Sequence, residues 1–178
     1  MNHIEIAQVN MTHVGLLQKI AIQTFWETFS DVNSDENMKK YLEDRFSVEK
    51  LSAELGDENA KFYFARSGHN VIGYLKLNTG QSQTEIKKAN TVEIERIYVL
   101  KDFHGKKAGQ LLYGKALEIA RQLNADYIWL GVWEQNPRAI RFYTKNGFEA
   151  FDRHIFILGD DRQTDILMKK VLEKETDI

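Results

Sequence analysis

The 178-residue chain has no cysteine, and this absence removes several kinds of site at once. A disulfide scaffold, a thiolate zinc site and a cysteine nucleophile all depend on that side chain. A chain without cysteine also fits a reducing compartment, so we expect a cytoplasmic protein. With a single proline and no Gly-, Ser- or Pro-rich tract, the chain is not expected to be disordered.

A strong charge of one sign and a long hydrophobic run are missing as well. The 24 Lys and Arg nearly balance the 26 Asp and Glu, and the net charge of −2 argues against nucleic acid or an anionic membrane as partner. The longest apolar run, Tyr127–Trp133, is far shorter than the roughly 20 residues of a spanning helix. Residues 1–6 lack a basic start followed by an apolar stretch, so no secretory signal is expected. The five histidines lack metal-ligand spacing, so no metal site is expected.

Apolar residues are plentiful, at 43%, and the length suits one domain over residues 1–178. Apolar positions three and four residues apart predict helices that begin after Thr12, Ser34 and Ser47. Alternating, β-branched and aromatic segments predict strands over 4–9, 62–65, 71–77, 92–99, 127–132, 148–158 and 164–172. The strand–helix–strand order between 92 and 132 predicts a right-handed crossover and a parallel pair. We therefore expect a mixed α/β sheet with helices on both faces.

A loop with small residues joins the strand over 92–99 to the next helix. Gly105, Ala108 and Gly109 lie in this segment, with two lysines between them. The start of a helix presents unpaired backbone N–H groups and the positive end of the helix dipole, and small residues allow a phosphate to approach. A pyrophosphate is the ligand that suits such a junction, and a tight turn with glycines for geometry alone is the alternative. Neither a P-loop pattern nor a G-x-G-x-x-G dinucleotide pattern is present.

A second motif follows that loop and its helix. Asn136, Ala139, Tyr143 and Gly147-Phe148 form the pattern Asn-x-x-Ala-x-x-x-Tyr-x-x-x-Gly-Phe. Together the two motifs span residues 92–148 and resemble the GNAT superfamily of acyl-CoA-dependent N-acyltransferases. The resemblance implies a GNAT-like mixed sheet of about seven strands with a splayed parallel central pair. It also implies acetyl-CoA as co-substrate.

Three further segments are similar to the bacterial spermine/spermidine N-acetyltransferases of that superfamily: Glu93–Val99, Trp129–Glu134 and Gly159–Asp165. This similarity implies transfer of an acetyl group to a primary amine of a small cationic acceptor, such as spermidine or spermine. Two alternatives stay open, namely acetylation of a protein N-terminus or lysine, and a catalytically silent CoA-binding regulatory module. A homodimer also stays open.

The chain departs from the superfamily pattern at three positions. His104 stands where Gln or Arg is usual, and Lys107 stands where a glycine is usual, while Gly109 is kept. Because lysine resists a positive φ, we expect a helix-like backbone at Lys107. Gly131 stands where some relatives carry a catalytic glutamate, so that route to a base is closed.

The resemblance assigns a set of residues to the cofactor. The backbone of Ile97 and Val99 would pair with the pantetheine arm like an extra strand, which requires the strands over 92–99 and 127–132 to separate. Ordinary pairing along their full length is the alternative. Asn136 would cap its helix and touch the cofactor, although capping alone explains it. The complete set is Ile97, Tyr98, Val99, His104, Gly105, Lys106, Lys107, Ala108, Gly109, Gln110, Asn136 and Tyr143.

Tyr143 is the expected general acid, because a phenol can protonate the departing thiolate. The alternative is a helix tyrosine packed beside Phe142. Glu95, acting through a water, is the first candidate for the base that deprotonates the amine, and Glu93 is the second. Alternation places both glutamates on one face of their strand, opposite Ile94, Arg96 and Tyr98. The alternative is a pair of solvated charges, one of them paired with Arg96 or a lysine.

Acceptor recognition is assigned to an acidic segment near the N-terminus. The segment from Trp26 to Asp44 contains six acidic residues and only two basic ones. The resemblance to the family implies that the first two helices lie beside the acceptor opening, where this negative charge would attract a cationic amine. Solvated helix faces are the alternative. Trp26 and Trp133 could line an aliphatic channel, although both are more often packing residues.

Overall fold

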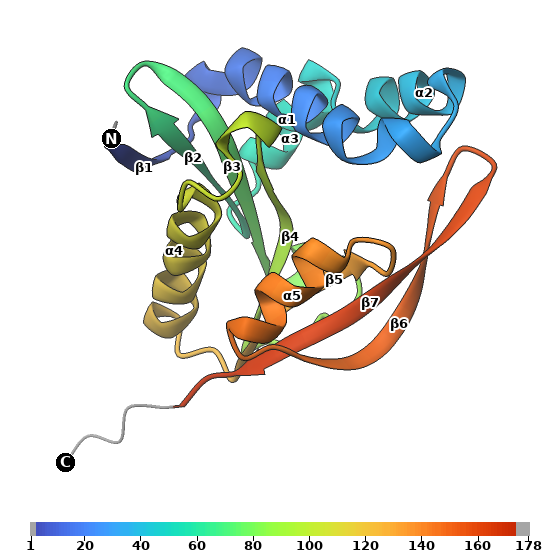
Figure 1. Ribbon diagram of the computed structural model, residues 1–178. Helices are drawn as coiled ribbons and strands as arrows, with labels where there is room; N and C mark the ends of the chain where they lie inside the picture. The colour runs from blue at the N-terminus through green and yellow to red at the C-terminus, as the bar shows by residue number, and fades with distance from the viewer. Residues whose placement is uncertain (1–2, 174–178) are drawn as a thin grey trace.

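Seven strands form one mixed sheet in the computed structural model, which describes residues 3–173 (Figure 1). Their order across the sheet is β1-β2-β3-β4-β5-β7-β6. The strands are β1 (Ile4–Gln8), β2 (Ala60–Ser67), β3 (Asn70–Thr79), β4 (Thr91–Val99), β5 (Tyr127–Trp133), β6 (Glu149–Leu158) and β7 (Asp161–Val171). The expected mixed sheet is confirmed, while residues 1–2 and 174–178 of the expected domain lie outside the described residues.

Helices cover both faces of the sheet, as expected. On one face α1 (Val14–Phe29), α2 (Asp35–Arg45) and α3 (Val48–Leu55) pack with Phe62, Phe64 and Tyr74 into one apolar core. On the other face α4 (Ala108–Gln122) and α5 (Pro137–Lys145) form a second core with the sheet. No helix within residues 3–173 is long and apolar enough to cross a membrane.

Side-chain caps explain where several helices begin. The hydroxyls of Ser34 and Ser47 accept from the third residue of α2 and of α3, as their positions in the sequence predict. Asn136 caps α5 in the same way and is followed by proline in the first turn. The prediction for Thr12 was wrong: Asn10 caps a short 3-10 turn over Met11–His13 that precedes α1, and Thr12 donates to it.

The central parallel strands β4 and β5 separate half-way along their length. They pair only from Thr91 to Ile94 on β4 and from Tyr127 to Leu130 on β5. Beyond these residues β4 continues to Val99, while β5 stays paired on its other edge with β7, as it is along its whole length from Tyr127 to Trp133. The edge of β4 after Ile94 therefore has no partner strand on that side, and the expected separation is confirmed.

A bulge in β4 changes which side chains share a face. The register against β3 shifts next to Glu95, so Lys76 lies opposite Arg96 and Leu77 lies opposite Ile94. Before the bulge Ile94 points to the α4–α5 side, whereas after it Tyr98 points to the α1–α3 side. Arg96, opposite Lys76, contacts Glu54 of α3 on that same side. The prediction that Ile94, Arg96 and Tyr98 share one face, opposite the glutamates, was therefore wrong, because a bulge inserts one extra residue and resets the alternation.

The β6–β7 hairpin reaches out from the sheet and back towards α2 (Figure 1). At its tip Gly159 has a φ of +60°, and a Cβ there would lie 2.3 Å from the Asn37 amide of α2. Gln163 of β7 donates to the Asn33 side chain just before α2. The hairpin tip is thus fixed against the helical layer.

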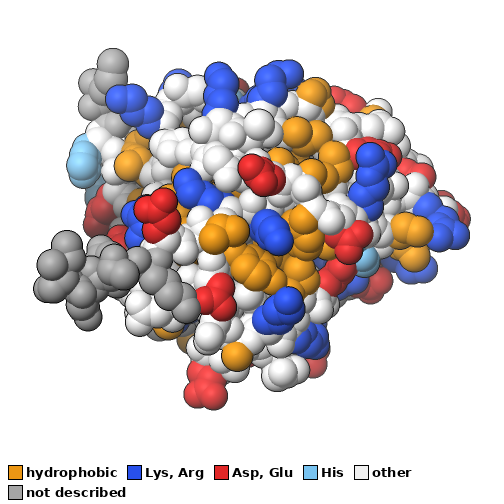
Figure 2. Space-filling model, turned by 90° about the horizontal axis from the view of Figure 1, so that it is seen from below, with side chains coloured by type: hydrophobic (Ala, Val, Ile, Leu, Met, Phe, Trp, Pro, Cys, Tyr) orange, Lys and Arg blue, Asp and Glu red, His pale blue; other side chains and the backbone are white. Residues whose placement is uncertain are grey.

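Strand β6 forms an exposed edge of the sheet, and its exposed apolar side chains include Phe151, Ile155 and Ile157. Figure 2 views the molecule from below and shows hydrophobic side chains gathered near the middle of that face, with charged ones around them. Single exposed apolar residues are ordinary on protein surfaces, so these side chains alone identify no partner.

Candidate active site

A cleft of about 370 Å³ lies where β4 and β5 separate, and we call it the splay cleft. Its walls include β4 after the bulge, β5 from Leu130 onwards and the start of α5. Of the residues that the sequence assigned to the cofactor, six line it: Ile97, Tyr98, Val99, His104, Asn136 and Tyr143. Residues far apart in the chain are therefore brought together as expected.

A second cavity, of about 280 Å³, lies beside the first, and we call it the acidic cavity. Four carboxylate side chains line it, namely Glu85, Glu93, Glu95 and Asp165. Its remaining walls are largely aromatic and include Phe25, Phe29, Tyr41, Phe46, Tyr98, Trp129, Trp133 and Phe156. The two spaces share the lining residues Phe29, Ile94, Glu95, Tyr98, Gly131 and Trp133. A molecule in one can therefore meet a molecule in the other at the point where the strands separate.

The loop before α4 has the geometry of an anion-binding turn. Gly105 has a φ of 76°, and Lys107, at the N-cap of α4, has a φ of 69°. The expected helix-like backbone at Lys107 was therefore wrong: the turn into α4 imposes the left-handed conformation in spite of its steric cost. No side chain caps α4, so the N–H groups of its first turn can bind an anion together with the loop.

Other residues of this loop face the protein instead. Ala108 is buried in the core, so only its backbone can reach a ligand. The Lys106 ammonium lies 4.9 Å from the centre of the Phe103 ring, and the Gln110 side chain donates to Asn146, directly after α5. The loop therefore offers backbone N–H groups to an anion, together with the exposed side chains of Lys106 and Lys107.

His104 connects the end of β4 to α5. Its Nε2 lies 2.7 Å from the Val99 carbonyl oxygen, and its Nδ1 contacts the Arg138 guanidinium. Since arginine can only donate hydrogen bonds, Nδ1 of His104 accepts from Arg138. The ring proton is therefore on Nε2, which donates a hydrogen bond to the Val99 carbonyl oxygen. Burial, together with the Arg138 charge, lowers the pKa of His104, which favours this neutral form. The Val99 carbonyl, which the sequence assigned to pantetheine, thus already has a donor.

Tyr143 is buried in the middle of α5 and lines the splay cleft. Its ring packs edge-on against Phe142 and Phe148, and none of residues 3–173 hydrogen-bonds its hydroxyl. Burial raises its pKa above the usual value, so the phenol keeps its proton. A protonated, unpaired hydroxyl in this position is free to bind a group in the cleft.

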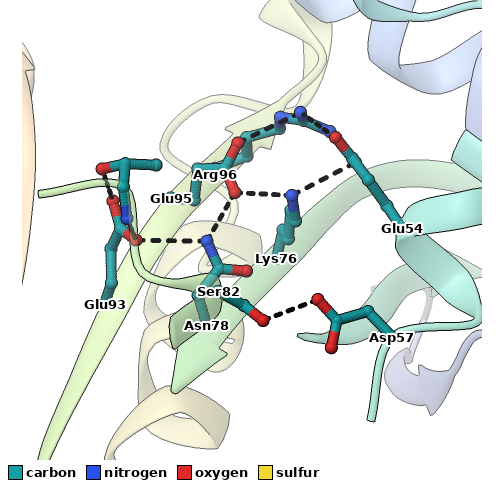
Figure 3. Close-up of polar contacts among 9 residues, drawn as sticks. Glu54, Asp57, Lys76, Asn78, Ser82, Glu93, Glu95 and Arg96 are labelled. Atoms are coloured by element: carbon teal, nitrogen blue, oxygen red, sulfur yellow. Dashed lines mark hydrogen bonds and ion pairs between the residues drawn. The ribbon is translucent and has the colours of Figure 1, made fainter. Parts of the chain in front are cut away.

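Glu95 belongs to a buried network of four charges (Figure 3). Its carboxylate lies 2.5 Å from the Lys76 ammonium and 3.1 Å from the Arg96 guanidinium, and both cations also contact Glu54. Burial alone would raise the pKa of Glu95, but Arg96 and Lys76 outweigh it and lower the pKa to about 2. A carboxylate held so firmly in its ionised form is a weak proton acceptor. Base catalysis by Glu95 stays a prediction that this geometry does not favour.

Glu93 lies on the other side of Asn78, whose amide donates to both glutamates (Figure 3). The backbone N–H and the hydroxyl of Thr84 also donate to the Glu93 carboxylate. Burial raises the pKa of Glu93 in spite of these hydrogen bonds. Glu93 is therefore better placed than Glu95 to exchange a proton, but its oxygens are already occupied.

The acidic segment near the N-terminus lies beside the site, but most of its carboxylates do not line it. Only Glu27 reaches the splay cleft, where its carboxylate accepts from the backbone N–H of Lys101. The remaining acidic residues of the segment are exposed and line neither space: Asp31, Asp35, Glu36, Glu43 and Asp44. Trp26 lines a separate groove between the first three helices, whereas Trp133 lines both the cleft and the cavity. Attraction of a cationic amine by this segment stays a prediction: α1 and α2 do contribute Phe25, Phe29, Tyr41 and Arg45 to the acidic cavity, whereas Trp26 does not line it.

Asp165 and Glu85 are the residues of this site to which sequence reasoning gave no role. Both lie outside the two motifs, on β7 and in the loop before β4. An isolated glycine inside an apolar strand indicates that another group approaches the backbone closely at that position. Gly131 is such a glycine, and the group that approaches it is the Asp165 carboxylate. Within residues 3–173 no group of three or more His, Asp or Glu is arranged to hold a metal ion.

Residues 20–148 match the sequence profile of the acetyltransferase (GNAT) family. The chain belongs to this family. An uncharacterized N-acetyltransferase from the pepI 3′ region of Lactobacillus delbrueckii subsp. lactis is 41% identical, and the match covers 97% of this chain and 99% of that protein. A spermidine N(1)-acetyltransferase from Thermoplasma acidophilum is 27% identical over 84% of this chain and 90% of its own length. The crystal structure of the PaiA N-acetyltransferase from the same organism, in complex with coenzyme A, has a TM-score of 0.78 at 25% identity and covers 96% of this chain and 99% of that one.

This GNAT protein is an N-acetyltransferase with acetyl-CoA as co-substrate. Its splay cleft fits that molecule, because the unpaired edge of β4 can bind an amide-containing chain and the turn at residues 104–110 can bind phosphates. The buried hydroxyl of Tyr143 lies in the same cleft.

Proposed function

We propose that this GNAT protein acetylates a primary amine of a small aliphatic polycation, with spermidine and spermine as the leading acceptors. The observation that carries the proposal is the composition of the acidic cavity. Its four carboxylates outnumber its two guanidinium groups, of Arg45 and Arg96, and Arg96 is already paired with Glu54 and Glu95. An excess of negative charge attracts a cationic amine into the cavity.

The aromatic walls of the acidic cavity support the same acceptor class. Trp133 lies at the junction with the splay cleft, and its ring contacts Phe29, which in turn contacts Phe156. Aromatic faces attract an alkylammonium group through cation–π contacts and pack against its methylene groups. The similarity to the spermidine N(1)-acetyltransferase of Thermoplasma acidophilum supports a polyamine acceptor as well.

We further propose direct transfer within a ternary complex. The chain has no cysteine to carry an acyl group, so the amine attacks the thioester carbonyl itself. Backbone N–H groups on the free edge of β4 stabilise the oxyanion that develops, and Tyr143 donates its proton to the departing thiolate sulfur. The protein contributes mainly by aligning the two substrates. The absence of cysteine supports a cytoplasmic location.

A panel of acceptors tests this proposal, with CoA release measured by a thiol reagent. We expect the highest kcat/KM with spermidine or spermine, a lower value with 1,8-diaminooctane and a much lower value with octylamine. The last two compounds have equal chain length but differ by one ammonium group, so their comparison isolates the contribution of the acidic cavity. A preference for peptides with a free N-terminus or lysine would refute the polyamine assignment. Absence of turnover with every amine, with CoA still bound, would identify a silent CoA-binding module.

A further inference from the structure

The carboxylate of Asp165 lies over Gly131 at the junction of the two spaces. Asp165 is on β7 opposite Trp133 of β5, and its Oδ2 is 3.4 Å from the position that a Cβ on Gly131 would occupy. Gly131 is exposed and lines both the splay cleft and the acidic cavity. Because glycine has no side chain there, the Asp165 carboxylate occupies space next to the point where the amine must meet the thioester.

Asp165 is also free to react. Glu93 is bound by Thr84, Glu95 is bound by Lys76 and Arg96, and Glu85 contacts His154. Among the four carboxylates of the acidic cavity, Asp165 alone has neither a hydrogen bond nor an ion pair to any of residues 3–173. A half-buried carboxylate without a partner favours a cationic ligand or a proton.

We propose that Asp165 is the group that takes the proton from the acceptor amine. The proposal deepens the proposed function, since it assigns the base of that same reaction. The ammonium gives one proton to an Asp165 oxygen, and the neutral amine then attacks the acetyl carbonyl carbon. The C–N bond forms, the C–S bond breaks, and the thiolate takes the Tyr143 proton. The surplus proton on the new amide nitrogen returns to the Tyr143 oxygen, and Asp165 releases its proton to solvent, so one proton is released per turnover.

The surroundings of Asp165 suit this role. Burial raises the pKa of Asp165 to about 6, with Glu85 adding to the increase and His154 opposing it. The charge of Asp165 also acts on Tyr41 of α2 and Tyr98 of β4, and burial raises the pKa of both phenols. Both therefore stay protonated at neutral pH and cannot accept the proton of the amine. At pH 7 the carboxylate is mainly ionised, yet it binds a proton more readily than an ordinary aspartate does. A base with a pKa near the working pH is the efficient choice for this step.

The test compares Asp165→Asn with the wild-type enzyme and with Asp160→Asn. Asp160 lies exposed in the β6–β7 turn, so its substitution removes the same charge from the same hairpin without touching either space. We expect Asp165→Asn to lower kcat about 10²-fold or more while CoA binding is unchanged. In the wild type, kcat/KM for the amine should fall below a pH near 6, the value to which the pKa of Asp165 is raised in the free protein, and this acidic limb should be absent from the residual activity of Asp165→Asn. Asp160→Asn should behave like the wild type.

Three results would overturn the proposal, two from kinetics and one from titration. The first is a kcat within about threefold of the wild type, with the acidic limb retained. The second is a raised KM for the amine with an unchanged kcat, because Asp165 would then only anchor the cation. Titration of the Asp165 carboxyl carbon by NMR gives an independent readout, and a pKa at the ordinary aspartate value also contradicts the assignment. Turnover of the wild-type enzyme in the acceptor panel tests the proposed function. The ratio of the kcat of Asp165→Asn to that of the wild type, measured on the best acceptor, tests the role of Asp165. Failure of one proposal can therefore be distinguished from failure of the other.

Discussion

Gly109, the second residue of α4, provides a sharp test of where the diphosphate of acetyl-CoA lies. A Cβ at this position would meet nothing within 4 Å, so Gly109→Ala introduces no clash within the protein. Alanine is favoured over glycine in a helix by about 1 kcal/mol, which corresponds to an increase in Tm of about 2–4 °C for a chain of this size. The added methyl group projects from the first turn of α4, beside the N–H groups that would bind the diphosphate. If the diphosphate binds there, the Kd for CoA should rise about tenfold, a loss of ~1.4 kcal/mol.

The matched control is Gly114→Ala, one and a half turns further along the same helix. Its Cβ also meets nothing within 4 Å, so it should stabilise the protein by a similar amount and leave CoA binding unchanged. Thermal unfolding without ligand and calorimetric titration with CoA measure the two effects separately. If Gly109→Ala raises Tm and leaves the Kd unchanged, the diphosphate does not lie over the start of α4 and this part of the reasoning is refuted.

Three further predictions follow from the buried groups of the site. Tyr143→Phe should lower kcat by about 10²-fold and leave the Kd for CoA within about twofold, and an unchanged kcat contradicts the proton-donor role. Glu54→Gln should lower the free energy of unfolding by about 3 kcal/mol, because Arg96 and Lys76 would stay buried with too few carboxylates; a urea titration that gives less than about 1 kcal/mol disproves this. In the folded protein the pKa of Glu95 is lowered to about 2. The ionised Glu95 carboxylate should therefore stabilise the folded state fully above pH ~4.5, and this contribution should be lost as the pH falls towards 2. Glu95→Gln should therefore flatten the acid side of the stability curve, and an equally steep curve would count against the network.

Local sequence signals were sufficient for most of the fold. Caps at Ser34, Ser47 and Asn136 and alternating apolar residues act within a few positions of one another, so they can be interpreted from one segment at a time. The separation of β4 from β5 was predicted only through the resemblance to a family, because no pattern within either strand indicates where their pairing ends.

The errors arose where distant segments decide local geometry. The bulge at Glu95 depends on the register that β3 imposes on β4, and nothing in the sequence of β4 itself indicates it. Lys107 adopts a left-handed conformation because the turn from β4 into α4 requires it, which overrides the weak preference of lysine against positive φ. A rule based on residue type alone gives the opposite answer at both places.

The two halves of the site differ in how far the sequence can predict them, and this difference bears on specificity. Most of the cofactor half comes from one stretch, residues 94–143, and Glu27, Thr28 and Phe29 of α1 complete the walls of the splay cleft. The proposed acceptor half, the acidic cavity, is assembled from separate segments, which contribute Glu85, His154 and Asp165. The pairing of β5 with β7 places the Asp165 carboxylate over Gly131. Charge counted along one segment, as between Trp26 and Asp44, therefore does not identify the carboxylates that line the acidic cavity. It follows that GNAT proteins can share the cofactor motifs and still differ in acceptor, because substitutions at positions such as 131 and 165 alter the acceptor half while leaving those motifs intact.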